Sequence, residues 1–265
     1  MFKTAIHCHS TYSDGEFTLA ELRELFSGAG YHLVCMTDHA EWFDPDKLRS
    51  YVEECANLSD ERFRFIAGLE FECERRMHIL GYGVTSLVDS IAPQEVISHI
   101  EDAGGVSVIA HPGDSMFDWI ESFEILPTGI EAWNSKYDGP LAPRPRTFQL
   151  LNRLQLRKPE MKAFYGQDLH WKKQYRGLLN FLDCDVADRT SVLRAFRSGS
   201  YQGFNDQTEL PSSGQLPESL LVNYKKISER YMRKQKMFKR VKKMSGAVGK
   251  NLPAPVKAHL RKIFS

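Results

Sequence analysis

The sequence predicts an α/β fold made of parallel βα units. Short apolar runs recur along the chain, and each is followed by a polar cluster, which is typical of buried strands. The runs are TAIHC, YHLVCMT, RFRFIAGLE, MHILGYG, GVSVIAH, GIEAWN and MKAFYGQD. Segments with helical periodicity lie between several of them. Alternating strands and helices favour right-handed crossovers in a barrel or an open sheet.

Three segments carry the helical periodicity. The segment TLAELRELFSGAG (18–30) has apolar residues on one face, including Leu19, Leu22 and Phe26, and glycines near its end. The segments DPDKLRSYVEECANL (44–58) and PQEVISHIEDAGG (93–105) follow the second and fourth runs. We therefore expect helices over these three segments.

The chain is long enough for one large core followed by a short extension. Its 265 residues fit a single barrel-sized domain, which we place at residues 1–204. The stretch NDQTELPSSGQLPES is rich in Pro, Ser and Gly, and it predicts a linker over 205–218. Residues 219–265 form a separate C-terminal tail.

Composition excludes several classes of protein. Hydrophobic residues make up 42% of the chain, yet no apolar run approaches the roughly 18 residues of a membrane span. The N-terminal MFKTAIHCHS leaves no room for the apolar stretch of a signal peptide, so we expect a cytoplasmic protein. Five cysteines without a Cys-x-x-Cys pair favour reduced thiols over a disulfide framework or a structural zinc site.

The C-terminal tail has a charge of its own. It contains 14 Lys and Arg residues and one acid, Glu229, whereas residues 1–218 carry a net charge of −12. Apolar residues recur at steps of three, four or seven from Leu220 to Val241, so the tail is expected to form a basic amphipathic helix. Three partners stay open for it: the acidic barrel, an anionic membrane surface that would make the protein peripheral, and nucleic acid.

Histidines and carboxylates gather at the ends of the predicted strands. His7 and His9 are two apart on the first run, so strand alternation points both side chains to one face. The other members of this set are Asp14, His39, Glu70, His78, His111, Asp168 and His170. Because the carboxyl ends of parallel strands meet at one rim, these distant residues are expected to converge on one pocket.

The nine residues offer imidazole and carboxylate ligands and no thiolate. That mixture suits Zn, Mn or Fe better than Ca or Mg alone. Nine ligands exceed what one ion needs, so the sequence predicts two or three ions bridged by a carboxylate. The remaining histidines, His32, His99 and His259, are interpreted as structural or solvated.

The motifs H-x-H-S, S-D-G, T-D-H, G-x-E, H-I-L-G, A-H-P and G-x-D-x-H occur in this order within residues 4–185. Together they resemble the polymerase and histidinol phosphatase (PHP) superfamily of metal-dependent phosphoesterases. Asp14 is similar to the S-D-G branch of stand-alone members. Only 32 residues separate His78 from His111, too few for the cap domain that nucleotide-processing members insert there.

The resemblance implies a distorted, TIM-like (β/α)7 barrel with three divalent metal ions at its carboxyl rim. The first ion would be held by His7, His9, Glu70 and Asp168. Glu70 would bridge to the second ion, which His78 and His111 complete. Asp14, His39 and His170 would hold the third.

The resemblance also implies a hydrolase that cleaves a phosphomonoester of a small molecule through a hydroxide bridging two ions, with Glu70, Asp168 and His111 at the catalytic centre. Two alternatives stay open: a phosphodiesterase or nuclease acting on short oligonucleotides, and a non-catalytic, metal-dependent binding module.

Binding of the substrate phosphate is expected to need a fixed cation. Arg144 and Arg176, in loops after predicted strands, are the candidates. Trp42, Trp133 and Trp171 are candidates for the wall of the pocket.

Overall fold

The structure is a computed structural model that describes residues 1–175, 177–205 and 208–248, with side chains described as far as Met237. Residues 249–265 of the predicted tail lie outside this description, as does Arg176. The fold is mixed α/β, as the sequence predicts.

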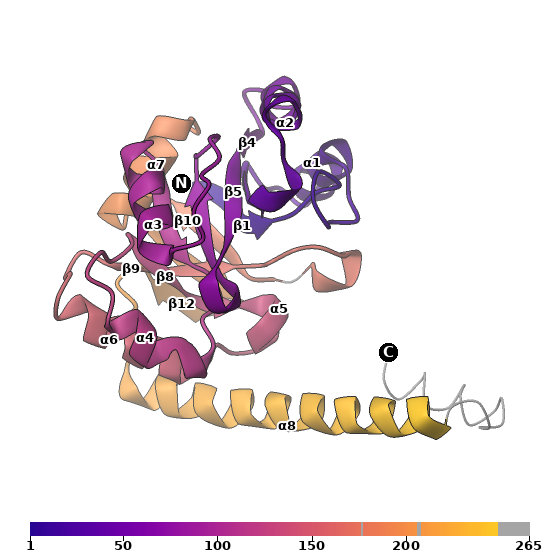
Figure 1. Cartoon of the computed structure of the whole chain (residues 1–265), viewed down its shortest axis with the longest axis vertical. Helices are drawn as coiled ribbons and strands as arrows, with labels where there is room; N and C mark the ends of the chain where they lie inside the picture. Colours follow the sequence, from indigo (N-terminus) through magenta and orange to yellow (C-terminus); the bar gives the residue numbers. More distant parts are fainter. Residues whose placement is uncertain (176, 206–207, 249–265) are drawn as a thin grey trace.

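Two six-stranded sheets form the body (Figure 1). The first sheet has the order β12-β11-β10-β1-β2-β4 and contains β1 (Phe2–Cys8), β2 (Leu33–Met36), β4 (Arg64–Ile66), β10 (Leu179–Leu182), β11 (Tyr201–Asn205) and β12 (Thr208–Pro211). The second has the order β3-β5-β6-β7-β8-β9 and contains β3 (Asp38–His39), β5 (Gly68–Cys73), β6 (Met77–Tyr82), β7 (Val106–Ile109), β8 (Gly129–Asn134) and β9 (Lys162–Gly166).

The pairing of the described strands differs from the expected all-parallel units. Pairs β1/β2, β2/β4, β3/β5, β7/β8 and β8/β9 are parallel, whereas β5/β6, β6/β7 and β1/β10 are antiparallel. A three-residue connection, η2 (Glu74–Arg76), joins β5 to β6, and so short a link permits only a hairpin. The two sheets meet at a β-bridge between Cys8, at the end of β1, and Leu169, in the segment after β9. The strand pairing of the described residues does not show one closed barrel.

Helices cover the sheets, and the three predicted between the strands are present. These are α1 (Leu19–Gly28), α2 (Pro45–Asn57) and α3 (Pro93–Asp102). Further helices are α4 (Phe117–Glu121), α5 (Ser135–Asp138), α6 (Pro145–Gln155), α7 (Arg189–Ser198) and α8 (Glu218–Val248), with short 3-10 turns η1 (Ala40–Trp42), η3 (Asp114–Met116) and η4 (Lys172–Gln174). Thr18 begins α1 with a capping box to Glu21, which satisfies free amide groups at the helix start.

The predicted linker over 205–218 is wrong in part. Residues Thr208–Pro211 form β12, which pairs with β11, and the Leu210 side chain is fully buried. The Pro and Gly residues of this stretch therefore turn the chain around an added edge strand. The run is too short and too polar for periodicity to distinguish it from a loop.

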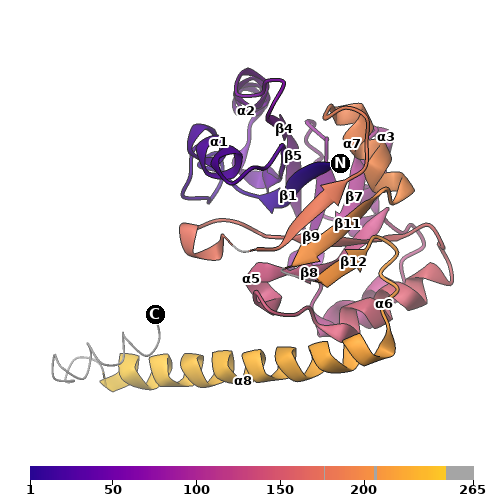
Figure 2. The same ribbon diagram turned by 180° about the vertical axis from the view of Figure 1, so that it is seen from behind.

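The last helix, α8, begins against the body and continues past it. Tyr224 is buried, and Leu220, Leu221 and Ile227 pack against the hydrophobic core. Both views show the second half of α8 running beyond the rest of the described chain (Figure 1, Figure 2). Among the described residues, no helix combines the length and the apolar character that a membrane crossing requires.

Candidate metal centre

The two histidines at the end of β1 lie side by side, although simple strand alternation does not place them. His7 has a left-handed backbone with φ 60°, and the register to β2 shifts between Ile6 and Cys8. The strand ends at Cys8, so His9 follows in the loop. The rings of His7 and His9 are fully buried and their centroids are 5.2 Å apart.

Two other residues of the predicted set share this rare backbone state. His111 has φ 27° and Asp168 has φ 52°. Left-handed backbone costs a residue with a Cβ about 1–3 kcal/mol and persists where its surroundings enforce it, commonly at functional sites. Three of the nine predicted residues are therefore held in a strained conformation, which strand periodicity does not reveal.

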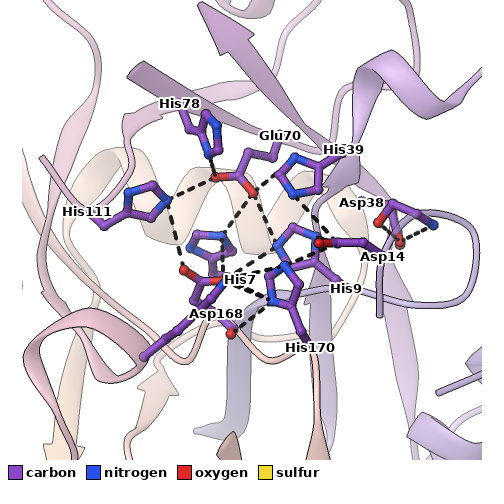
Figure 3. Close-up of polar contacts among 12 residues, drawn as sticks. His7, His9, Asp14, Asp38, His39, Glu70, His78, His111, Asp168 and His170 are labelled. Atoms are coloured by element: carbon purple, nitrogen blue, oxygen red, sulfur yellow. Dashed lines mark hydrogen bonds and ion pairs between the residues drawn. The ribbon is translucent and has the colours of Figure 1, made fainter. Parts of the chain in front are cut away.

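The structure brings all nine side chains together in one cluster (Figure 3). Four groups each have ligand atoms within 4.8 Å of one another: His9, Asp14, His39 and His170; His7, His9 and Asp168; His7, Glu70 and His111; and His39, Glu70 and His78. His78 is at the start of its strand, not the end. Because β6 runs antiparallel to β5 and β7, its start lies at the same rim.

Glu70 is the centre of this cluster. One carboxylate oxygen lies 2.8 Å from His78 Nδ1 and 3.3 Å from His111 Nε2. The other lies 3.3 Å from His7 Nε2 and 3.2 Å from His9 Nε2. A carboxylate placed between two pairs of imidazoles has the arrangement needed to bridge two cations.

The third group opens towards solvent through Asp14. Its carboxylate lies 3.1 Å from His170 Nε2 and 3.6 Å from His39 Nε2, and its side chain is 39% exposed. The loop that carries it is held by Asp38, which accepts hydrogen bonds from the backbone and hydroxyl groups of Ser10 and Ser13. Figure 3 shows Asp38 turned away from the cluster, so it fixes the loop and does not join the ligand groups.

The side chains of the centre fit divalent ions. Both ring nitrogens of His9 and Nδ1 of His39 are buried and make no hydrogen bond within the described structure. A buried, unpaired imidazole nitrogen is unfavourable unless another partner takes its lone pair. Neutral imidazole nitrogens and ionised carboxylates are ligands that Zn, Mn and Fe accept.

Electrostatics of the metal-free centre follow from its buried acids. Burial alone would lower the pKa of His7, but Glu131, Asp168 and Glu70 surround the ring and hold that pKa well above its usual value. For His170, burial is outweighed by Asp14 and Asp168, and the pKa rises to about 9. Burial and the neighbouring rings of His170 and His7 lower the pKa of His9 to about 3. Protons therefore occupy part of this site when metal is absent.

The stability of metal-free protein is expected to fall as pH rises from about 6.5 to 9. An unfolded histidine titrates near 6.5, and His170 in the folded protein titrates at about 9. The raised pKa contributes stability in full below 6.5, and this contribution is lost as pH passes through 9. Urea unfolding of chelator-treated protein at several pH values measures this slope, and His170→Gln should reduce it. A free energy of unfolding that is flat or rising over this window would contradict the assignment.

Sequence analysis missed the buried carboxylate of Glu131 on β8. Its oxygens accept hydrogen bonds from Asn134 Nδ2 at 2.8 Å and from the backbone N–H of His111 at 2.9 Å. His7 Nδ1 lies 2.8 Å from the same carboxylate, so a proton on Nδ1 would leave Nε2 free to face Glu70. The only available signal was an acid inside the otherwise apolar run GIEAWN.

Gly166, at the end of β9, leaves the space that Glu131 needs. A Cβ at Gly166 would lie 1.8 Å from Glu131 Oε1, whereas a Cβ at Gly28 in α1 would meet nothing within 4 Å. Gly166→Ala is therefore expected to destabilise the protein by about 1–3 kcal/mol or more, because neither the sheet nor the acid can move freely. Gly28→Ala should be neutral or stabilise by up to about 1 kcal/mol. Chemical denaturation checks both, and equal effects would show that the space is not required.

A second missed residue is Lys136 in α5, the first turn after β8. Its Nζ lies 2.9 Å from Asp168 Oδ1 and 3.3 Å from the ring nitrogens of His170. Within the described part of the chain, Lys136 is the lysine or arginine that forms an ion pair with a member of the predicted ligand set. The ring of Tyr137 lies beside it, 4.5 Å from the ring of His111.

The two arginines predicted to bind the substrate phosphate are not among the contacts of the cluster that the structure describes. Arg144 pairs with Asp138 and Asp114 and donates to the carbonyl of Pro112, so its contacts bind neighbouring loops together. Arg176 lies outside the described residues.

The three tryptophans differ in exposure. Trp133 is 1% exposed and donates to the carbonyl of Gly139, so its prediction as a pocket wall is wrong; on a fully buried strand its ring belongs to the core. Trp171 is 40% exposed beside His170, and Trp42 is 51% exposed after His39.

A comparison with protein-family models identifies the family of this chain. The model of the PHP domain matches residues 5–240. The chain belongs to the PHP domain family. The resemblance drawn from the histidine motifs is confirmed, and the matched range extends into α8.

Solved structures similar to this PHP protein agree with the fold. A two-domain protein from Bacteroides vulgatus, described as containing a predicted PHP-like metal-dependent phosphoesterase, is 15% identical, with TM-score 0.55 over 78% of this chain and 66% of that one. PsfC from Pseudomonas syringae is 16% identical, with TM-score 0.52 over 88% of this chain and 98% of its own. An amidohydrolase from Chromobacterium violaceum with bound sulfate and no metal is 16% identical, with TM-score 0.51 over 73% of this chain and 96% of that one.

A curated relative shares only a short region. The DNA polymerase/3'-5' exonuclease PolX of Bacillus subtilis is 31% identical over 78 residues, which cover 26% of this chain and 14% of PolX. The chain thus spans a small fraction of that relative.

Proposed function

We propose that this PHP protein is a metal-dependent phosphoesterase that hydrolyses a phosphomonoester of a small molecule. The observation that carries the proposal is Glu70, fully buried between His78 and His111 on one oxygen and His7 and His9 on the other. A group of acids and imidazoles that serves folding alone would seldom leave buried ring nitrogens of His9 and His39 without a hydrogen-bond partner.

The proposed ligand assignment is the one that the family resemblance implies. Every residue in it belongs to one of the four geometric groups, although those groups place His111 with His7 and His78 with His39. Glu70 would be shared by a first ion held with His7, His9 and Asp168 and a second held with His78 and His111, and a third ion would lie among Asp14, His39 and His170. Divalent ions of the Mn, Zn or Fe type would supply Lewis acidity and a water molecule whose pKa is lowered towards about 7. Glu131 would keep His7 oriented through its Nδ1.

Lys136 is our candidate for the group that binds the substrate phosphate. Its ammonium lies at the edge of the ligand cluster, next to Asp168 and His170, where a phosphate held over the centre would come within its reach. Arg144 remains a proposed contributor from the neighbouring loop, although Asp138 and Asp114 already neutralise much of its charge. Arg176 remains a proposal from the sequence.

The first test is phosphate release from a panel of substrates. The panel contains sugar phosphates, nucleotides, phosphoamino acids, histidinol phosphate and short oligonucleotides, assayed with manganese-loaded protein and with Asp168→Ala. Metal-dependent release from a monoester, lost in Asp168→Ala, supports the proposal. Cleavage confined to oligonucleotides would support the nuclease alternative, for which the short similarity to PolX provides a reason. Bound metal without turnover of any member would favour a binding module.

Lys136→Met is expected to weaken phosphate binding by about 10- to 100-fold, because a charge-assisted hydrogen bond contributes roughly 1.5–3 kcal/mol. The expected effect is a higher KM for the best substrate and weaker binding of inorganic phosphate in calorimetry. Lys136→Arg should recover part of the loss. Lys173→Met is the matched control, since the Lys173 ammonium lies over the ring of Trp171 at the same rim. Equal phosphate affinity in Lys136→Met and the parent protein would remove Lys136 from the site.

A further inference from the structure

Helix α8 has two halves with different surroundings. Its first turns pack on the body: Tyr224 and Ser228 are buried, and Tyr231 lies against Gly139, the residue that follows α5. Beyond this point the helix leaves the body in both views (Figure 1, Figure 2). Docking on the body therefore accounts for the first half of the helix and not for the second.

The solvent-facing side of α8 is strongly basic. Its exposed cations within the described side chains are Lys225, Lys226, Arg230, Arg233, Lys234 and Lys236. Glu229, the one acid between Lys225 and Lys236, lies 3.6 Å from Arg233. Residues 1–218 carry a net charge of −12, so an anionic partner is attracted to the helix and repelled by the body.

Apolar residues accompany the cations where the helix leaves the body. Met237 is 57% exposed, although Met is normally buried. The sequence continues with the apolar residues Phe238, Val241 and Met244, which recur at spacings of three or four along the chain. The backbone of α8 extends to Val248. Lys239, Arg240, Lys242 and Lys243 occupy the positions between them.

We propose that the second half of α8 binds the surface of an anionic lipid bilayer. Met237 lies beside Arg230, Arg233 and Lys234 on the surface of α8. In the headgroup region of a bilayer, Lys and Arg extend their charged ends to the headgroups, and the neighbouring apolar side chains enter the acyl boundary. Anionic headgroups attract such cations, and the attraction falls with salt. The projecting position lets the helix meet the bilayer while the acidic body stays away from it.

Nucleic acid fits the same helix less well. Phosphate backbones attract the cations but offer nothing to an apolar stripe. Single-strand platforms stack bases on exposed aromatic rings, whereas the two tyrosines of the described part of α8 are engaged with the body: Tyr224 is buried and Tyr231 lies against Gly139. The bilayer surface uses both the charge and the apolar residues.

The test is co-sedimentation of the full-length protein with vesicles. Phosphatidylcholine vesicles are compared with vesicles containing about 30% phosphatidylserine, at 0.1 M and 0.5 M NaCl. The parent protein is expected to bind the anionic vesicles at low salt, at least tenfold more weakly at high salt, and the neutral vesicles weakly at both.

Two variants make the test specific to α8. Arg233→Glu/Lys234→Glu/Lys236→Glu reverses three exposed charges away from the docked turns, and binding should fall more than tenfold. Arg49→Glu/Arg62→Glu/Arg194→Glu changes the net charge equally at exposed positions on the body and should bind within about twofold of the parent. Met237→Gln should weaken binding by several-fold without changing any charge.

Several outcomes would overturn the proposal. They are an equal loss of vesicle binding in both triple variants, equal binding of the parent protein to neutral and anionic vesicles, and the absence of any vesicle binding. Salt-dependent capture of a fluorescent oligonucleotide, without vesicle binding and lost in the α8 triple variant, would assign the helix to nucleic acid instead. Circular dichroism confirms that each variant is folded. The readout is binding alone, so it is independent of the proposed hydrolysis.

Discussion

Glu70→Gln is expected to lower metal-dependent phosphate release by about 10³-fold or more. Both oxygens of this carboxylate are engaged by imidazoles in the structure, one by His78 and His111 and the other by His7 and His9. An amide offers one neutral acceptor and an NH2 group that repels a cation, so it cannot replace a bridging carboxylate. The measurement is kcat/KM on the best substrate of the panel, together with the metal content of the purified variant.

Glu72→Gln is the matched control for this change. Glu72 is on the same strand, two residues from Glu70, and its side chain is exposed. It should retain the parent rate and metal content. A Glu70→Gln variant that keeps three-quarters of its activity and all its metal would rule out a bridging role for this carboxylate.

Glu131→Gln is expected to reduce metal affinity or activity by about 10- to 100-fold, the usual effect of losing a partner that orients a ligand. Glu131 is buried, and its carboxylate forms hydrogen bonds with His7, with Asn134 and with the backbone N–H of His111. The amide keeps the volume but removes the anion that would favour a proton on His7 Nδ1. Metal affinity is measured by competition with a chromophoric chelator, in parallel with kcat/KM.

The readout separates positioning from a purely structural role. If Glu131 only fills the core, Glu131→Gln should lower the melting temperature and leave metal affinity unchanged. The control is Glu124→Gln, an exposed acid in the loop before β8, which should alter neither quantity.

The cluster of nine candidate ligands was predictable from sequence because its residue types are chemically distinctive and most of them follow apolar runs. His7, His39, Glu70, His111 and Asp168 each stand at or just beyond the end of a run, and most of the strands and the first three helices lie where periodicity places them. Convergence needed only the rule that carboxyl ends of neighbouring strands meet at one rim. Family membership followed from the same motifs.

The residues that contact the candidate ligands were less predictable, because their positions depend on neighbours distant in sequence. Glu131 is one acid in an apolar strand, and only the fold brings it 2.8 Å from His7, 124 residues earlier in the chain. Nothing in the sequence distinguishes Lys136 from other lysines, and only the position of α5 brings its ammonium to Asp168. Trp133 resembled a pocket residue, but burial on both faces of β8 assigns it to the core.

The sequence alone determined the alternation of strands and helices, the chemistry of the nine site residues and the opposite charges of body and tail. Tertiary structure decided the antiparallel pairing of β5 with β6 and β7, the left-handed backbone at His7, His111 and Asp168, and the point at which α8 leaves the body. The physical reason is that composition and periodicity report local preferences of the chain, whereas strain and buried charge persist only when many distant contacts enforce them.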